Sequence, residues 1–78
     1  MGVKLYMSTK WVGDKLGLNL KIKRIEKEYT QIELSKKLGI SRYYLSALER
    51  GKATNPSLEL MKKISNVLNV TVQELFFE

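Results

Sequence analysis

The sequence predicts an all-α fold, a compact domain of five short helices, and three observations lead to this fold class. Apolar residues recur at spacings of three and four, as they do on one face of a helix. Two Thr-x-x-Glu capping boxes, at residues 30–33 and 71–74, mark the starts of helices. Glycine or asparagine follows several of these segments, where a helix ends in a left-handed residue. No convincing sheet pattern accompanies these signals.

The middle of the chain contains the clearest helix boundaries. Thr30 opens a helix over about residues 31–38, and Gly39 supplies the left-handed residue that ends it. Ser41 can cap a second helix, which covers about residues 41–50. Two helices therefore follow each other after a very short turn.

The last third of the chain predicts two more helices. Asn55-Pro56 indicates a loop, and a helix that starts near Ser57 and runs to Leu68 follows it, with Asn69 as its C-terminal stop. The second capping box then opens a short terminal helix. The predicted core consists of the apolar residues that share faces in these helices, namely Leu34, Leu38, Leu45, Leu48, Leu58, Met61, Ile64 and Leu68.

The helical stretch of residues 14–28 is apolar on two nearly opposite faces, which is typical of a helix between two neighbours. One face carries Leu16 and Leu20, with Arg24 one turn further along; the other carries Leu18, Ile22 and Ile25. We expect the second face to be covered by the N-terminal segment, through Val3, Leu5 or Trp11, or by a second subunit. A competing register would turn Leu18, Ile22, Ile25 and Tyr29 inward and would need a tighter turn before Thr30.

The composition excludes several classes of function. The 78 residues form one domain, and a hydrophobic content of 44% argues against disorder. The chain has no cysteine and no histidine, so the commonest general base and most zinc ligands are missing. We therefore expect no catalytic residue, no metal site, no small-molecule cofactor and no enzyme activity. The apolar runs are too short for a membrane span, which favours a cytoplasmic location without membrane contact.

Positive charge is concentrated in one part of the chain. The net charge is +6, and residues 18–53 carry nine basic and four acidic side chains. Acidic side chains outnumber basic ones after residue 53. Such a basic segment favours a polyanionic partner, nucleic acid ahead of an acidic membrane, although basic side chains can also serve solubility alone.

The two helices around Gly39 outline a helix-turn-helix, in which the second helix enters the major groove of DNA. At its leading end, Arg42 can contact guanine O6 and N7 together, and Tyr43 can lie against a thymine methyl group. Ser46 and Ala47, one turn further on, keep the helix thin. The alternative for Arg42 is an ordinary solvated surface arginine.

Glu49 presents a separate problem, because it falls at the edge of the inward face defined by Leu45 and Leu48. An unpaired carboxylate in this place would be costly. Arg24 lies on the Leu16/Leu20 face, so the sequence predicts a mostly buried Arg24–Glu49 ion pair.

The run TQIELSKKLGISRYYLSALERGK, residues 30–52, resembles the helix-turn-helix of the phage-repressor/Cro-like (Xre) family. Residues 55–76 resemble the family's fourth and fifth helices, and Leu16-Gly17 with Leu20 and Arg24 matches its first helix. The resemblance implies a lambda-repressor-like DNA-binding domain of five helices over residues 16–78, after an N-terminal extension of residues 1–15.

The resemblance also implies which side chains contact DNA. Base contacts are expected from Arg42, Tyr43, Ser46 and Ala47. Phosphate contacts are expected from Gln31, Ser41, Tyr44, Arg50, Lys52 and Thr54. Tyr44 has the alternative of being a half-buried aromatic residue, and Lys52 that of being a solvated lysine.

The predicted function is that of a sequence-specific transcriptional regulator, such as a repressor, that binds double-stranded DNA. We expect a homodimer on a partly palindromic operator, because readers of this type pair their recognition helices. Two adjacent phenylalanines cannot both point into one small core, so we expect a dimer interface made by Val72, Leu75, Phe76 and Phe77. The alternative is a protein-interaction adaptor or an antitoxin that uses the helix of Phe76 and Phe77.

Overall fold

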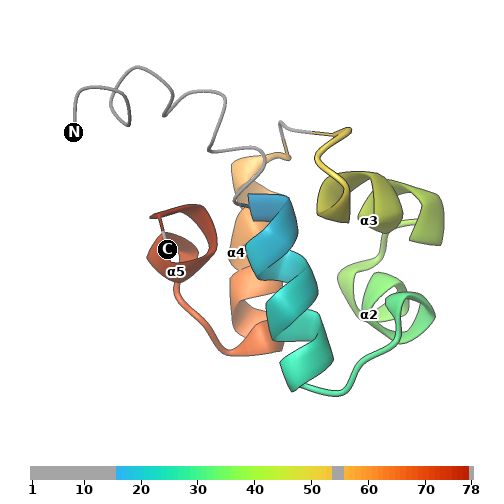
Figure 1. The fold of residues 1–78 in the computed structure, drawn as a ribbon, viewed down its shortest axis with the longest axis horizontal. Helices are drawn as coiled ribbons and strands as arrows, with labels where there is room; N and C mark the ends of the chain where they lie inside the picture. Colours follow the sequence, from blue (N-terminus) through green and yellow to red (C-terminus); the bar gives the residue numbers. More distant parts are fainter. Residues whose placement is uncertain (1–15, 54–55, 78) are drawn as a thin grey trace.

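The computed structural model describes residues 16–53 and 56–77, and of Phe76 and Phe77 only the backbone. The described residues form five helices and no strand, which confirms the all-α fold class (Figure 1). These are helix 16–26, α2 (Gln31–Leu38), α3 (Arg42–Glu49), α4 (Leu58–Leu68) and α5 (Val72–Phe77). The predicted N-terminal extension, residues 1–15, and Thr54 lie outside the described residues.

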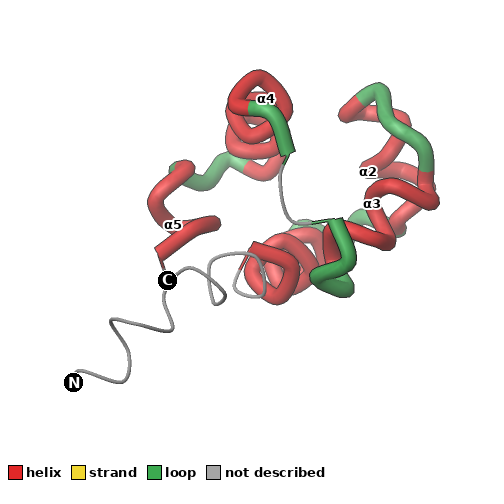
Figure 2. The backbone as a smooth tube through the Cα atoms, turned by 90° about the horizontal axis from the view of Figure 1, so that it is seen from above, coloured by secondary structure: helices red, strands yellow, loops and turns green. Residues whose placement is uncertain are grey.

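The helices are arranged around helix 16–26. Helix 16–26 lies between α5 on one side and the α2–α3 pair on the other, in both Figure 1 and Figure 2. The side chain of Asn19 joins it to α5, because its Nδ2 donates to the carbonyls of Glu74 and Leu75, each at 3.1 Å. Helix 16–26 therefore contacts both halves of the domain.

The helix boundaries around the central turn agree with the sequence. Thr30 Oγ1 accepts a hydrogen bond from Glu33 N at 3.0 Å, and Glu33 Oε1 accepts one from Thr30 N at 2.8 Å. Gly39 ends α2 with φ of 72°. Ser41 Oγ then accepts from Tyr44 N at 3.0 Å and caps α3. The predicted capping residues are confirmed at each of these points.

The same local rules define α4 and α5. Ser57 Oγ caps α4 by accepting from Leu60 N at 3.1 Å, and Asn69 ends the helix with φ of 56°. In the second capping box, Glu74 N donates to Thr71 Oγ1 at 3.0 Å and Thr71 N donates to Glu74 Oε1 at 2.9 Å. Short-range hydrogen bonds thus account for where each helix from α2 to α5 starts. They do not determine how these helices pack.

The two capping boxes should make stability depend on pH in the acid range. Hydrogen bonds from the backbone amides of Thr30 and Thr71 hold the pKa of Glu33 and Glu74 below its ordinary value of 4.5. Because the pKa is lower in the folded state, the boxes stabilise the protein above about pH 4.5 and lose this contribution as the pH falls. The melting temperature of the Glu33→Gln/Glu74→Gln protein should therefore lie below that of the parent at neutral pH.

The difference in melting temperature should shrink as both proteins are titrated from about pH 6 to about pH 3. Glu59→Gln, at an exposed glutamate outside both boxes, serves as the control. A difference between parent and double variant that is the same at both ends of the titration would contradict this explanation.

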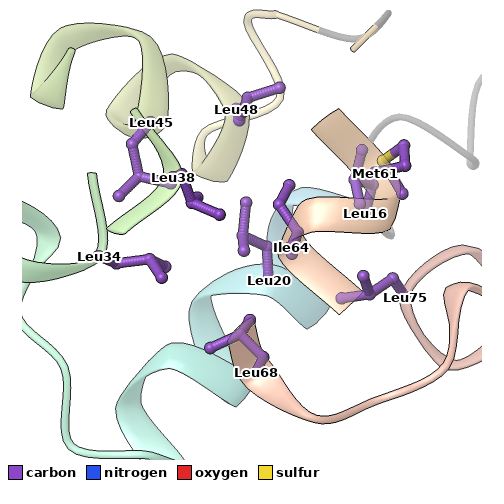
Figure 3. Packing of buried hydrophobic residues seen from close by; sticks show 10 residues of the cluster. All are labelled: Leu16, Leu20, Leu34, Leu38, Leu45, Leu48, Met61, Ile64, Leu68 and Leu75. Carbon is purple, nitrogen blue, oxygen red and sulfur yellow. The ribbon is translucent and has the colours of Figure 1, made fainter. Parts of the chain in front are cut away.

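One hydrophobic core is shared by all the described helices (Figure 3). Ten apolar side chains are at most 2% exposed, and they come from helix 16–26 and from α2 to α5. They are Leu16, Leu20, Leu34, Leu38, Leu45, Leu48, Met61, Ile64, Leu68 and Leu75.

The core prediction was wrong at Leu58, which is 66% exposed. Residues advance by about 100° along a helix, so Leu58 lies roughly 90° from the centre of the face of Met61, Ile64 and Leu68. Leu60, on the opposite flank of α4, packs against the core instead. Leu58, at the first position of α4, thus has a helical spacing from the core residues of α4 but does not face the interior.

Helix 16–26 has its Leu16/Leu20 face in the core, so the competing register is wrong. Leu18, Ile22 and Ile25 on the other face are 57%, 42% and 54% exposed. No described residue covers this face.

The end of helix 16–26 explains why this register is possible. Glu28 adopts a left-handed conformation with φ of 63°, although it is not a glycine. Its amide donates to the Ile25 carbonyl at 2.9 Å, and Tyr29 N donates to the Arg24 carbonyl at 3.1 Å. This pair of bonds is a Schellman motif. The motif reverses the chain early enough for Tyr29 to pack against the core from outside the helix.

Leu75 was wrongly assigned to a dimer interface. Its side chain is 0% exposed within the core of this single chain, so it attaches α5 to the domain. Val72 is half-buried and packs against the same core. The side chains of Phe76 and Phe77 lie outside the described residues.

Candidate nucleic-acid interface

The inner face of α3 determines which of its side chains can point outward. Leu45 and Leu48 are 0% exposed and attach α3 to the core. The turn of residues 39–41 places α3 directly against α2. Because one face of α3 is held inside, the opposite face is presented to solvent along the whole helix.

The outward face carries the residues predicted to read bases. Tyr43 is 81% exposed, and the guanidinium carbon of Arg42 lies 5.9 Å from the centroid of its ring. Ser46 and Ala47 are half-buried one turn further on. Arg50 is exposed, and its Nε donates to the Ser46 carbonyl at 3.3 Å. One face therefore carries a cation and an aromatic ring first, small side chains next and a second cation last.

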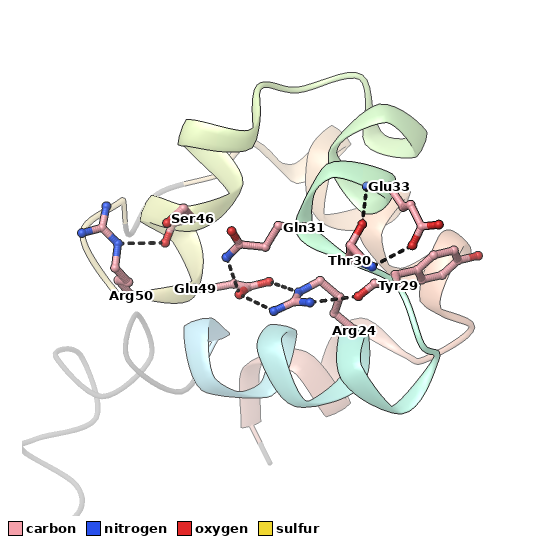
Figure 4. Close-up of polar contacts among 8 residues, drawn as sticks. All are labelled: Arg24, Tyr29, Thr30, Gln31, Glu33, Ser46, Glu49 and Arg50. Atoms are coloured by element: carbon pink, nitrogen blue, oxygen red, sulfur yellow. Dashed lines mark hydrogen bonds and ion pairs between the residues drawn. The ribbon is translucent and has the colours of Figure 1, made fainter.

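The predicted Arg24–Glu49 ion pair is present and is bidentate (Figure 4). Arg24 Nε donates to Glu49 Oε2 at 2.6 Å and Arg24 Nη2 donates to Oε1 at 3.1 Å. The two side chains are 12% and 3% exposed. A carboxylate at the inner edge of α3 is thus neutralised by an arginine from another helix.

Two further partners complete this polar network, and neither of these contacts was predicted from the sequence. Arg24 Nη1 donates to the Tyr29 carbonyl at 2.9 Å, and Gln31 Nε2 donates to Glu49 Oε1 at 3.0 Å. The network therefore joins helix 16–26, the chain before α2, the start of α2 and the end of α3 (Figure 4). Charge-assisted hydrogen bonds of this kind hold the orientation of α3 against its neighbours.

The residues predicted to contact phosphate fall into different environments. Gln31 is half-buried and uses its amide nitrogen inside the protein, while Ser41 is exposed and caps α3. Lys52 is exposed just after α3, and Tyr44 is half-buried and packs against the core. The structure thus shows Tyr44 as a half-buried aromatic residue. Phosphate contacts by these residues stay predictions.

Gly17 is a structural residue whose role the sequence did not reveal. A Cβ atom at Gly17 would lie 2.6 Å from the Leu48 carbonyl oxygen and 2.8 Å from that of Glu49. Helix 16–26 therefore crosses the end of α3 backbone to backbone. A glycine inside a helical pattern was the signal that could have indicated this close approach.

Other kinds of site are not seen in the described residues. Residues 16–53 and 56–77 contain no group of three or more acidic side chains that could hold a metal ion. Within the same ranges every helix is too short or too polar to cross a lipid bilayer.

Comparison with known proteins identifies the architecture. The pattern that defines the helix-turn-helix family matches residues 20–75. The chain belongs to the helix-turn-helix family. As a helix-turn-helix protein it is 43% identical over 63 residues to SinR of Bacillus subtilis, an HTH-type transcriptional regulator, and the match covers 81% of this chain and 57% of SinR. The family and such relatives are regulators rather than enzymes.

Two solved structures share the fold of this helix-turn-helix protein. The crystal structure of SinR in complex with DNA superposes with a TM-score of 0.73 at 43% identity, covering 77% of this chain and 95% of that one. The restriction-modification controller protein C.AhdI from Aeromonas hydrophila gives 0.74 at 33% identity, with coverages of 81% and 94%. The chain spans little more than half the length of full SinR.

Proposed function

We propose that this protein is a sequence-specific transcriptional regulator that binds double-stranded DNA through α3. The observation that carries the proposal is the outward face of α3, where Arg42, Tyr43 and Arg50 are exposed while Leu45 and Leu48 are buried. Only in this orientation can the helix present side chains to base edges.

The geometry suits insertion of α3 into the major groove, which is about 12 Å wide and admits one helix. Arg42 reads guanine through O6 and N7, and Tyr43 contacts a neighbouring base pair. Ser46 and Ala47 allow the helix to approach the groove floor. Outside the groove, Arg50 and Lys52 contact phosphates, together with Ser41, Gln31 and Thr54.

The relatives support this proposal. SinR was crystallised in complex with DNA, and a relative from Bacillus phage phi105 is named an immunity repressor protein. We extend the role of a repressor to this chain, with residues 16–78 as the DNA-binding domain and the cytoplasm as the compartment where it meets DNA. The proposed homodimer uses α5, through Val72, Phe76 and Phe77.

Selection of bound sites from a random DNA pool tests the proposal directly. Arg42→Ala should relax the preference at one position of each half-site and weaken binding by about 1–3 kcal/mol. Arg50→Ala removes the same charge from the other end of α3, but it should weaken binding to all sequences alike. It should also reduce the slope of the logarithm of the binding constant against the logarithm of the salt concentration by about one. Sites recovered with the parent should contain two inverted half-sites whose centres lie about 34 Å apart.

Lys36→Ala, at an exposed lysine of α2 outside the proposed contacts, is the matched control for loss of charge. Equal effects of Arg42→Ala and Lys36→Ala on the recovered sites would contradict base reading by Arg42. Recovery of single half-sites would contradict the homodimer but leave α3 as the reading helix. Binding to a partner protein without salt-dependent binding to duplex DNA would favour the adaptor or antitoxin.

A further inference from the structure

The exposed face of helix 16–26 is the most apolar surface that the described residues leave uncovered on a helix. Leu18, Ile22 and Ile25 are spaced by four and three residues, and they lie opposite the core face of Leu16 and Leu20. Ile25 also lines a shallow groove that Tyr29 and Ile32 share, so the apolar surface continues beyond the helix. A contiguous patch of this kind usually has a partner.

The chain that precedes this helix has a matching pattern. From residue 3 to residue 11, the odd positions are Val3, Leu5, Met7, Thr9 and Trp11, and all but one are strongly apolar. The even positions between them are Lys4, Tyr6, Ser8 and Lys10. In an extended segment, alternate side chains point to the same side, so one side would be apolar and the other polar.

The lengths of the two surfaces also agree. Leu18 and Ile25 are seven residues apart, which is about 10 Å along a helix. Met7 and Trp11 are four residues apart, which is about 13 Å in an extended chain. Gly13-Asp14 lies between Trp11 and the helix and is of the type that reverses a chain.

We propose that residues 3–11 fold back and lie extended, antiparallel to helix 16–26, on its exposed apolar face. Trp11 contacts Leu18 and Met7 reaches the level of Ile25. Leu5 then lies at the edge of the shallow groove next to Ile25, while Lys4 and Lys10 remain in water. A second copy of the chain on this face is the competing occupant.

Trp11 is the only tryptophan of the chain, so its fluorescence reports directly on this contact. In the full chain we expect a blue-shifted emission maximum and slow quenching by acrylamide, relative to free N-acetyltryptophanamide. Ile22→Asn should shift the emission to the red and raise the quenching constant severalfold, because it puts an amide in the middle of the apolar face. Leu58→Asn alters an apolar side chain on α4 that is even more exposed, and it should change neither quantity.

Each other outcome overturns the proposal. Parent emission and quenching equal to those of the free compound would show that Trp11 has no apolar contact. An unchanged spectrum in Ile22→Asn, with helix content verified by circular dichroism, would place Trp11 elsewhere. Protection that disappears on dilution together with a dimer in sedimentation would assign the face to a second copy. None of these readouts involves DNA, so they stand apart from the proposed function.

Discussion

Replacing Arg24 by alanine is expected to lower the free energy of unfolding by about 3–5 kcal/mol, because the change leaves Glu49 charged and buried without its partner. The Glu49 side chain is 3% exposed, and two of its three described hydrogen bonds come from Arg24. Gln31 supplies one neutral donor, which cannot replace a guanidinium. Urea denaturation of parent and variant measures the difference.

The neighbouring lysine provides a matched control for this prediction. Lys23 pairs with Glu26 at 3.5 Å on the surface, so Lys23→Ala should cost at most about 1 kcal/mol. Removing both buried partners in Arg24→Leu/Glu49→Leu should recover much of the loss, since no isolated charge remains. If Arg24→Ala unfolds at the same urea concentration as Lys23→Ala, the network contributes little to stability.

The second large effect is expected from Gly17→Ala. The added methyl group would lie 2.6 Å from the Leu48 carbonyl oxygen, far inside normal contact, and backbone atoms cannot rotate away as a side chain can. Overpacking of this kind costs typically 1–3 kcal/mol, and alanine regains up to about 1 kcal/mol of helix propensity. We expect a net loss of about 1–2 kcal/mol of stability, measured by thermal or urea unfolding.

The difference in stability between Lys21→Ala and Lys21→Gly, at an exposed position of the same helix, measures what a change from glycine to alanine does to helix propensity without a clash. A Gly17→Ala protein that is more stable than the parent by this difference would show that the close approach is not required. Relief of the clash must push the end of α3 away from helix 16–26. Under the proposed function, weaker DNA binding should therefore accompany the lost stability.

Local signals explain why the helix boundaries could be predicted. Thr30 and Glu33 complete each other's hydrogen bonds within four residues, and Gly39 and Asn69 adopt the left-handed conformation by their own preference. Glu28 adopts the same conformation without being a glycine or an asparagine. The end of helix 16–26 therefore could not be predicted from the sequence, and two registers of this helix remained possible.

The candidate site was predictable where it depends on which face of its own helix each residue occupies. The outward position of Tyr43 and the inward position of Leu45 and Leu48 follow from helical spacing alone. The buried charge of Glu49 could be paired with Arg24 because each lay on an inward face. The donation from Gln31 to Glu49 could not be predicted, because it requires the distance between the start of α2 and the end of α3.

By itself, the sequence determined the helical fold class, the caps of α2 to α5 and the outward face of α3, because these depend on interactions within a few residues. The tertiary structure decided which face of helix 16–26 enters the core, that Leu58 is exposed and that Leu75 is buried. It also decided that Gly17 must have no side chain. These features depend on contacts between helices that are distant in the chain. A periodic pattern of apolar residues indicates which residues share a face of a helix, but it does not indicate which other helix packs against that face.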